Sequence, residues 1–228
     1  MGKKSKKSKV RGINGPRPLG YQSQESPAYD PREAAGELRQ HAEIGESLGA
    51  QVNALDWKIE AACYEVQENE TTGSSYIPIV AVKRMKKLLS KAPSNYIPSA
   101  DCVWTCARND FSGEALKLLL ENGGIRRCNE WHSSNFSTPL SVCCSRGNVK
   151  GLKAMIAVAE QAGFTLDAGK TDIVGSEPLN YTVQSRCNNH AMGSIEDFGR
   201  VIELLVEKLG RDIESISIKH TSPPITGM

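Results

Sequence analysis

The stretch STPLSVCCSRGNVKGLKAMIAVAEQAGFTL, residues 137–166, decides how this 228-residue chain folds. It opens with Thr138-Pro139, a residue that can cap a helix followed by one that suits a first helical turn. A short apolar run, a Gly147-Asn148 break and a second amphipathic run that ends at Gly163 follow. The pattern predicts a helix, a tight turn and a second helix. Since one such pair cannot enclose a core, it must stack on similar units.

Two other segments repeat this plan. Residues 101–127 read DCVWTCARNDFSGEALKLLLENGGIRR, and residues 176–213 contain EPLNYTVQ and later FGRVIELLVEKLGRDI. Each begins with a turn, continues with a short helix that carries small residues, and ends with a more apolar second helix and a glycine. The chain is therefore predicted to hold about three helix pairs over residues 100–216.

On these residues the chain resembles the ankyrin-repeat family. Thr138-Pro139-Leu140 matches the family's Thr-Pro-Leu-His opening up to the histidine, which Ser141 and Asn180 replace. Pro139 and Pro178 lie 39 residues apart, whereas the family's period is about 33, so the repeats are irregular. The family's alanine pairs and second-helix ends have counterparts at Cys106-Ala107, Cys143-Cys144 and Thr182-Val183, and at LLLENG (118–123) and LLVE (204–207).

The expected fold is all-α, an ankyrin-like helix-turn-helix stack (an α-solenoid) preceded by one or two helices and a disordered basic tail. The domains are predicted as a tail at 1–30, a helical N-terminal extension at 31–98, the repeats at 99–216 and a disordered end at 217–228. Residues 1–24 carry a charge of +7, which leaves −5 on the remainder of a chain whose total is +2. The tail's cations include Lys3, Lys4, Lys6, Lys7, Lys9 and Arg11.

The extension has two helical patterns. After Asp30-Pro31, apolar residues recur from Leu48 to Ala62 in steps of four and three, which predicts a helix over 31–66. We expect its stripe to pack on the following domain; the alternative is a dimerisation helix. A second helix is expected over 77–91, with an apolar face and a basic face.

No catalytic or metal-binding grouping stands out. The seven cysteines include no CxxC pair, the four histidines are scattered, and no nucleotide-binding, zinc-protease or hydrolase motif occurs. We expect buried reduced thiols, no metal, no cofactor and no enzyme, in the cytoplasm or nucleus; Cys-His pairs at Cys128/His132 and Cys187/His190 are the alternative. No apolar run approaches the ~20 residues of a membrane span, so no membrane partner is expected.

The resemblance implies a non-catalytic scaffold or adaptor that binds another protein through its turn tips and the exposed sides of its first helices. Trp131 and Arg146 are the strongest candidates, because Trp and Arg dominate interface energetics; alternatively, Trp131 folds back over the helix pair, and Trp104 is expected in the core. The implied contact residues are Arg108, Asn109, Trp131, His132, Ser137, Ser145, Arg146, Asn180, Gln184 and Ser185.

The alternative function is a nucleic-acid or ribonucleoprotein-associated factor. Its affinity would come from the basic tail and the Lys83–Lys91 helix, and it would depend steeply on salt. The same tail is also typical of a nuclear import signal or of a solubilising leader.

Overall fold

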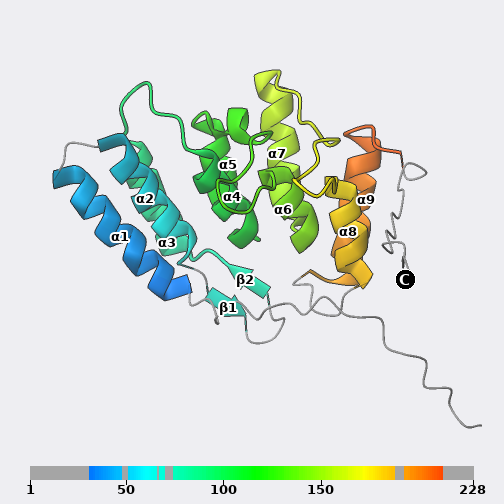
Figure 1. Cartoon of the computed structure of the whole chain (residues 1–228), viewed down its shortest axis with the longest axis horizontal. Coiled ribbons are helices and arrows are strands. Elements are labelled where there is room, and N and C mark those ends of the chain that lie inside the picture. The colour runs from blue at the N-terminus through cyan, green and yellow to red at the C-terminus, as the bar shows by residue number, and fades with distance from the viewer. Residues whose placement is uncertain (1–30, 48–50, 66, 70–73, 188–192, 213–228) are drawn as a thin grey trace, which may run out of the picture.

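A computed structural model describes residues 31–47, 51–65, 67–69, 74–187 and 193–212 of the chain (Figure 1). The described part is helical, apart from one antiparallel hairpin of three-residue strands. The all-α class is therefore confirmed. In chain order the elements are α1 (Pro31–Ser47), α2 (Gln51–Cys63), β1 (Gln67–Asn69), β2 (Ser74–Tyr76), α3 (Ile79–Leu89), α4 (Ala100–Asn109), α5 (Glu114–Glu121), the 3-10 helix η1 (Gly124–Arg127), α6 (Pro139–Arg146), α7 (Val149–Ala162), α8 (Pro178–Cys187) and α9 (Ile195–Glu207).

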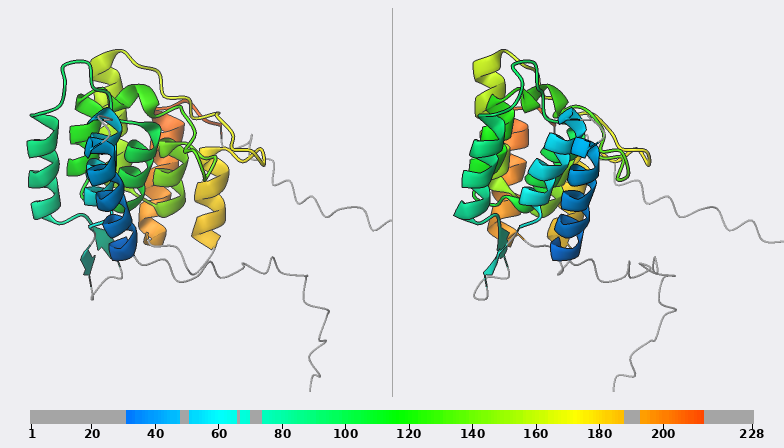
Figure 2. Two further views of the ribbon diagram at one scale, coloured as in Figure 1. Left: turned by 60° about the vertical axis from the view of Figure 1, so that its left-hand side comes forward. Right: turned by 90° about the vertical axis from the view of Figure 1, so that its left-hand side faces the viewer.

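The helices pack in two rows. Helices α2, α4, α6 and α8 are neighbours in one row, and α3, α5, α7 and α9 are neighbours in the other. Each first-row helix also packs on the second-row helix that follows it in the chain, and α1 covers α2 (Figures 1 and 2). The helix pairs expected at 101–127, 137–166 and 176–213 are all present. In addition α2 and α3 pack as a fourth pair at the N-terminal end of the rows.

The prediction of a single helix over residues 31–66 is wrong, because the chain forms two helices there that pack on each other. Helices α1 and α2 contact each other along their lengths, and a side chain on Gly45 would meet the ring of Trp57 at 2.8 Å. The end of the predicted stripe, Ile59 and Ala62, is buried against helices of the same chain. This apolar surface is therefore used within the molecule.

The middle pair, α6 and α7, is fixed by local caps. Thr138 Oγ1 accepts a hydrogen bond from Ser141 N at 3.1 Å, and Pro139 occupies the first turn of α6. Gly147 ends α6 with a φ of 66°, in the left-handed region that favours glycine. Asn148 then caps α7 by accepting from Gly151 N at 2.8 Å. Its amide nitrogen also donates to two carbonyls at the end of the previous unit's first helix, Ala107 O and Asp110 O, at 2.9 Å each.

Replacing Asn148 tests whether this amide joins the units. Asn148→Ala removes the α7 cap and leaves two buried carbonyls without their donor, so we expect a loss of about 2–4 kcal/mol in the free energy of unfolding. Asn148→Asp keeps a cap acceptor but turns a buried carboxylate oxygen toward the two carbonyl oxygens, so it should lose at least as much as Asn148→Ala. Urea unfolding measures both, with exposed Lys153→Ala on α7 as the control. Equal stability of Asn148→Ala and the wild type would contradict the role.

Carboxylates of α2 join the first helix pair to the second. Asp56 Oδ1 accepts from Tyr96 Oη at 2.5 Å and from Ser99 N at 3.3 Å. Glu60 Oε1 accepts from Thr105 Oγ1 of α4 at 3.1 Å. Burial raises the pKa of Glu60 to about 7, and nearby Asp101 and Asp56 act in the same direction against the effect of the Thr105 hydrogen bond. The folded chain therefore binds a proton at Glu60 more tightly than the unfolded chain does.

This proton sets the sign of a pH effect. Because the folded-state pKa of Glu60 is raised, its ionisation destabilises the fold progressively as pH rises from about 4.5 to above 7. Glu60→Gln, which cannot ionise, should be more stable than the wild type at pH 8 by ~1–3 kcal/mol, and this difference should vanish near pH 4. Thermal or urea unfolding across this range checks it, with exposed Glu203→Gln as the control. A difference that does not change with pH would contradict the assignment.

The core contains free thiols. Cys63, Cys102, Cys106, Cys128, Cys143 and Cys144 are all buried and unpaired by disulfides. Burial raises the pKa of both Cys128 and Cys144 to about 12, so these thiols stay protonated and unreactive near neutral pH. The prediction that cysteines are buried is confirmed for these six residues.

Candidate partner-binding surface

Two long loops lead into the first-row helices α6 and α8. The first loop, residues 128–138, precedes α6, and the second loop, residues 163–177, precedes α8. Both loops project on the side of the molecule away from α3 (Figure 2). They are joined by hydrogen bonds: Asn129 Nδ2 donates to Thr165 O, and Asn129 Oδ1 accepts from Asp167 N, each at 2.9 Å. Trp131 Nε1 donates to Thr171 O at 3.1 Å.

The first loop is built around His132. Its Nδ1 accepts from the backbone N–H groups of Ser134 and Asn135, at 3.1 Å each, which assigns the ring proton to Nε2. The ring packs on Trp104 of α4, with 4.4 Å between the ring centroids. On the same helix, Asp101 accepts from Ser133 N at 2.9 Å and from Ser133 Oγ at 2.6 Å. The loop is therefore held in place by α4 of the preceding unit.

The second loop is built around Asp172, which is buried. Its Oδ1 accepts from Val174 N at 2.9 Å and from Ser176 N at 2.7 Å, and its N–H donates to Ser176 O at 3.0 Å. Its Oδ2 accepts from the hydroxyl of Tyr181, which lies on α8. One carboxylate thus closes the loop tip and ties it to the helix that follows.

These two frameworks display large apolar side chains to solvent. Trp131 is 47% exposed and Phe136 is 43% exposed on the first loop, while Ile173 is 64% exposed and Val174 is 76% exposed on the second. Phe136 has a φ of 50°, a left-handed conformation that a bulky residue rarely adopts. Lys170 Nζ lies 5.1 Å from the centre of the Trp131 ring. Trp131, Phe136, Lys170, Ile173 and Val174 are called the loop-tip surface below.

The structure separates the sequence-predicted contact residues into two groups. Trp131 does not fold back over the helix pair; it is half exposed and joins the two loops. Arg108 and Arg146 are partly exposed at the ends of α4 and α6. The remaining predicted residues with at least partial exposure are Ser145, Asn180, Gln184 and Ser185.

Asn109, His132 and Ser137 are buried, which corrects their prediction as contact residues. His132 organises the first loop, and Ser137 Oγ accepts a hydrogen bond from Trp104 Nε1 at 2.9 Å. That bond confirms Trp104 as a core residue, since its indole N–H is satisfied inside the fold. A buried side chain with internal partners supports the surface but does not itself meet a partner.

The arginines of the first row lie near one another. Burial, with the neighbouring charge of Arg108, lowers the pKa of Arg146 to about 10. The Arg108 guanidinium lies 5.6 Å from the centre of the Trp104 ring, and that of Arg146 lies 5.9 Å from the centre of the Phe111 ring. Both cations are therefore held beside aromatic rings on the row that carries the loops.

Sequence reasoning missed Phe136, Lys170, Ile173 and Val174. The signal for the aliphatic pair was present, because Ile173-Val174 is the only apolar pair in the segment GKTDIVGSE, residues 169–177. An aspartate whose side chain can accept a hydrogen bond from the backbone N–H two residues later, with a glycine soon after it, is a turn signal. The residues between the aspartate and the glycine lie at the tip of such a turn and are exposed. The lysines and arginine predicted in the tail lie outside the described residues.

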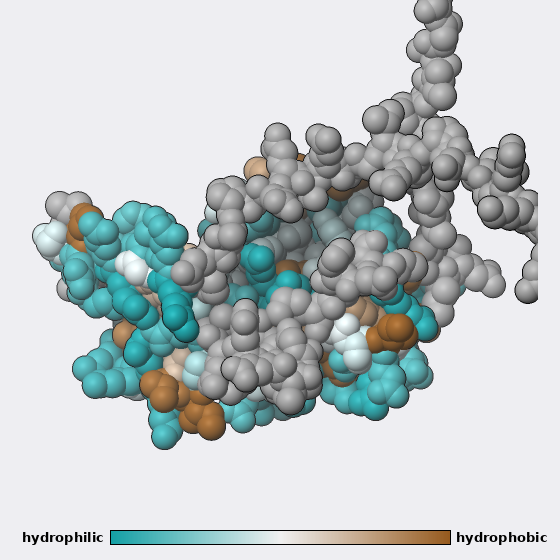
Figure 3. Space-filling view, turned by 90° about the horizontal axis from the view of Figure 1, so that it is seen from below, coloured by the Kyte–Doolittle hydropathy of each residue, from teal (hydrophilic) through white to brown (hydrophobic). Residues whose placement is uncertain are grey.

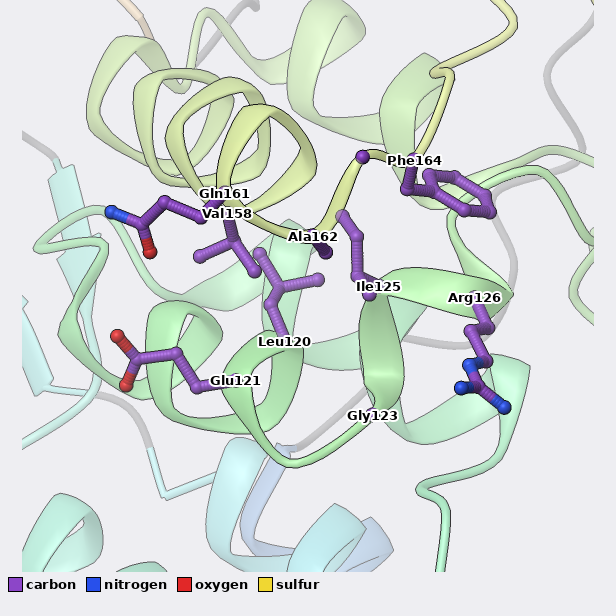
Figure 4. Close-up of a pocket in the computed structure, with 10 residues that line it drawn as sticks. Leu120, Glu121, Gly123, Ile125, Arg126, Val158, Gln161, Ala162 and Phe164 are labelled. Atoms are coloured by element: carbon purple, nitrogen blue, oxygen red, sulfur yellow. The ribbon is translucent and has the colours of Figure 1, made fainter.

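A shallow groove of about 410 Å³ lies between the ends of α5, η1 and α7 (Figure 4). Leu120, Ile125 and Val158 point toward one another in it, and the charged groups of Glu121 and Arg126 lie on its opposite sides. This lining offers no grouped acid, base or nucleophile. In the described ranges no three metal-ligating side chains gather, and no helix is both long and apolar enough to cross a bilayer.

No family model matches this chain, and no curated protein is significantly similar to it.

The titration of His132 tests the first loop. Burial lowers the pKa of His132, and Arg108 acts in the same direction, whereas Asp101 opposes the shift. The unfolded chain therefore takes up the proton first, and the stability that neutral His132 contributes is lost as pH falls below about 6.5. His132→Gln should cost about 1–2 kcal/mol at pH 8, and the cost should shrink on acidification. Urea unfolding at several pH values measures this, and Ser134→Ala, which keeps the backbone donor, should show a constant difference. A constant difference for His132→Gln would contradict the assignment.

Proposed function

We propose that this chain is a divergent ankyrin-type repeat protein that binds another protein without catalysis, through the loop-tip surface and the adjacent exposed side chains of the first-row helices. The two-row helix packing and the paired loops on one side support the repeat assignment. Stacked repeats of this kind expose an extended surface of loops and first helices, and proteins built from them use it for binding.

The observation that carries the proposal is the exposure of apolar side chains on ordered loops. Ile173 and Val174 stay mostly in water although the carboxylate of Asp172 holds the tip around them. Apolar groups that gather on a surface gain free energy when a partner covers them. Because internal hydrogen bonds already fix the loops, binding would cost little conformational entropy.

The composition of the loop-tip surface favours a protein partner. Trp131 offers a large ring with its N–H already satisfied, so a partner need only cover its face. Arg108 and Arg146 on the neighbouring helices can donate to carboxylate or carbonyl groups at the edge of such an interface. The nucleic-acid alternative stays a prediction, since its tail lies outside the described residues and α3 contains no aromatic ring for stacking on bases.

The test removes the aliphatic pair and leaves its frame intact. Ile173→Ser/Val174→Ser should weaken binding of an identified partner by at least about 30-fold if the pair is an interface hot spot, with an unchanged melting temperature. Partners are found by affinity capture and quantitative mass spectrometry with the full-length wild type, and the affinity of each purified partner is then measured by calorimetry.

The matched control is Ile195→Ser, which removes a side chain of similar exposure, 68%, at the start of α9. It should capture the same proteins as the wild type. Phe136→Asn separates binding from stability, because asparagine tolerates the left-handed φ and should keep or raise the melting temperature while binding falls. Retention of every partner by both loop variants would refute the proposed surface.

A further inference from the structure

Helix α3 is the outermost helix of the second row, and one of its faces is turned to solvent. Its inner face is buried in the core through Ala81, Val82, Met85 and Leu89. The outer face has a continuous set of exposed side chains, because their positions fall within roughly half of the helical circumference. These residues are Ile79, Val80, Lys83, Arg84, Lys86, Lys87 and Lys91.

The charge on this face has one sign. No acidic residue occurs between positions 77 and 91. Arg84 shares the carboxylate of Glu65 with Arg39 of α1, so these three side chains keep a net positive charge. Lys83, Lys86, Lys87 and Lys91 make no ion pair with any residue in the described part of the chain.

The lysines form a column that destabilises the free helix. Lys83 and Lys87 are four residues apart on α3, so they lie about 6 Å apart along the helix, and Lys91 follows in the turn after its end. Like charges at this spacing repel each other. An anionic surface that lies along the column would relieve this repulsion.

Two aliphatic side chains continue the same face at the first turn. Ile79 is 69% exposed and Val80 is 65% exposed, and both lie one turn from Lys83. Seen from below, brown apolar patches stand among larger teal areas of the surface (Figure 3). An apolar pair beside a lysine column is the composition of a helix that lies in the headgroup region of a membrane.

We propose that the outer face of α3 binds the surface of an anionic lipid bilayer. Lys83, Lys86, Lys87 and Lys91 meet the negatively charged headgroups, and Ile79 and Val80 enter the boundary between headgroups and acyl chains. A chain can lie on a bilayer without a helix that spans it, so this revises the expectation of no membrane partner. The basic tail has the same charge sign and would add to the attraction.

The aliphatic pair favours a bilayer over a nucleic acid. A phosphodiester backbone would pair with the lysines, but it offers no apolar layer for Ile79 and Val80. In both views of Figure 2, α3 lies at the edge of the molecule away from the two loops. Attachment through α3 would therefore leave the loop-tip surface free, and the proposal does not depend on the proposed function.

The test uses the full-length chain and sedimentation with vesicles of phosphatidylcholine, with or without phosphatidylserine. The wild type should bind only the phosphatidylserine vesicles. Changing Lys83, Lys86, Lys87 and Lys91 to Ser should weaken that binding at least about tenfold. The matched control changes exposed lysines outside α3, Lys117, Lys150, Lys153 and Lys208, to Ser. It alters the net charge equally and should stay within about twofold of the wild type.

The double variant Ile79→Ser/Val80→Ser distinguishes an anionic bilayer from a nucleic acid. It should weaken vesicle binding several-fold and leave binding to a single-stranded RNA unchanged. The proposal would be overturned if the wild type did not bind phosphatidylserine vesicles, or if the two lysine variants lost equal amounts of binding. It would also be overturned if Ile79→Ser/Val80→Ser left vesicle binding unchanged while RNA binding depended on the α3 lysines. The last result would assign α3 to a nucleic acid. Circular dichroism shows that each variant is folded.

Discussion

One buried amide joins two successive helix pairs in the middle of the stack. The side chain of Asn148 is 1% exposed, and its oxygen and nitrogen satisfy Gly151 N, Ala107 O and Asp110 O. These groups belong to two successive helix pairs, so the residue that starts α7 also fixes the distance and angle to the previous unit. A buried amide that leaves a partner unsatisfied costs free energy, which restricts the units to this one arrangement.

Buried polar side chains also fix the two loops. His132 and Asp172 are buried polar side chains that accept from backbone N–H groups, and each fixes a loop whose apolar residues face water. Asp101 and Trp104 of α4 hold the first loop from the preceding unit, through Ser133 and through the rings. The positions of the exposed residues of the loop-tip surface thus depend on buried residues. Substitutions in these two groups should therefore have different effects. Changes in the frame alter stability, whereas changes at the tips alter binding.

The N-terminal region belongs to the stack more closely than its sequence indicates. Helix α2 packs on α4, and α3 packs on α5, as each later pair does on the next. The region shows no Thr-Pro-Leu opening, although α2 carries the buried small-residue pair Ala61-Ala62, and a hairpin separates α2 from α3. Asp56 and Glu60 add polar links to the second pair. At the end of the second row, α3 has one face on which no other helix of the described residues packs.

The sequence by itself determined the helix pairs, because caps, turns and periodicity act within a few residues. Thr138, Gly147 and Asn148 are read as helix boundaries and form them. Burial is different, since it depends on neighbours that are distant in the chain. Ser137 looks like an exposed turn residue until Trp104, 33 positions earlier, donates to it. His132 and Trp131 are adjacent, yet tertiary packing buries one and exposes the other. Only the folded structure could decide which predicted contact residues support the surface and which belong to it.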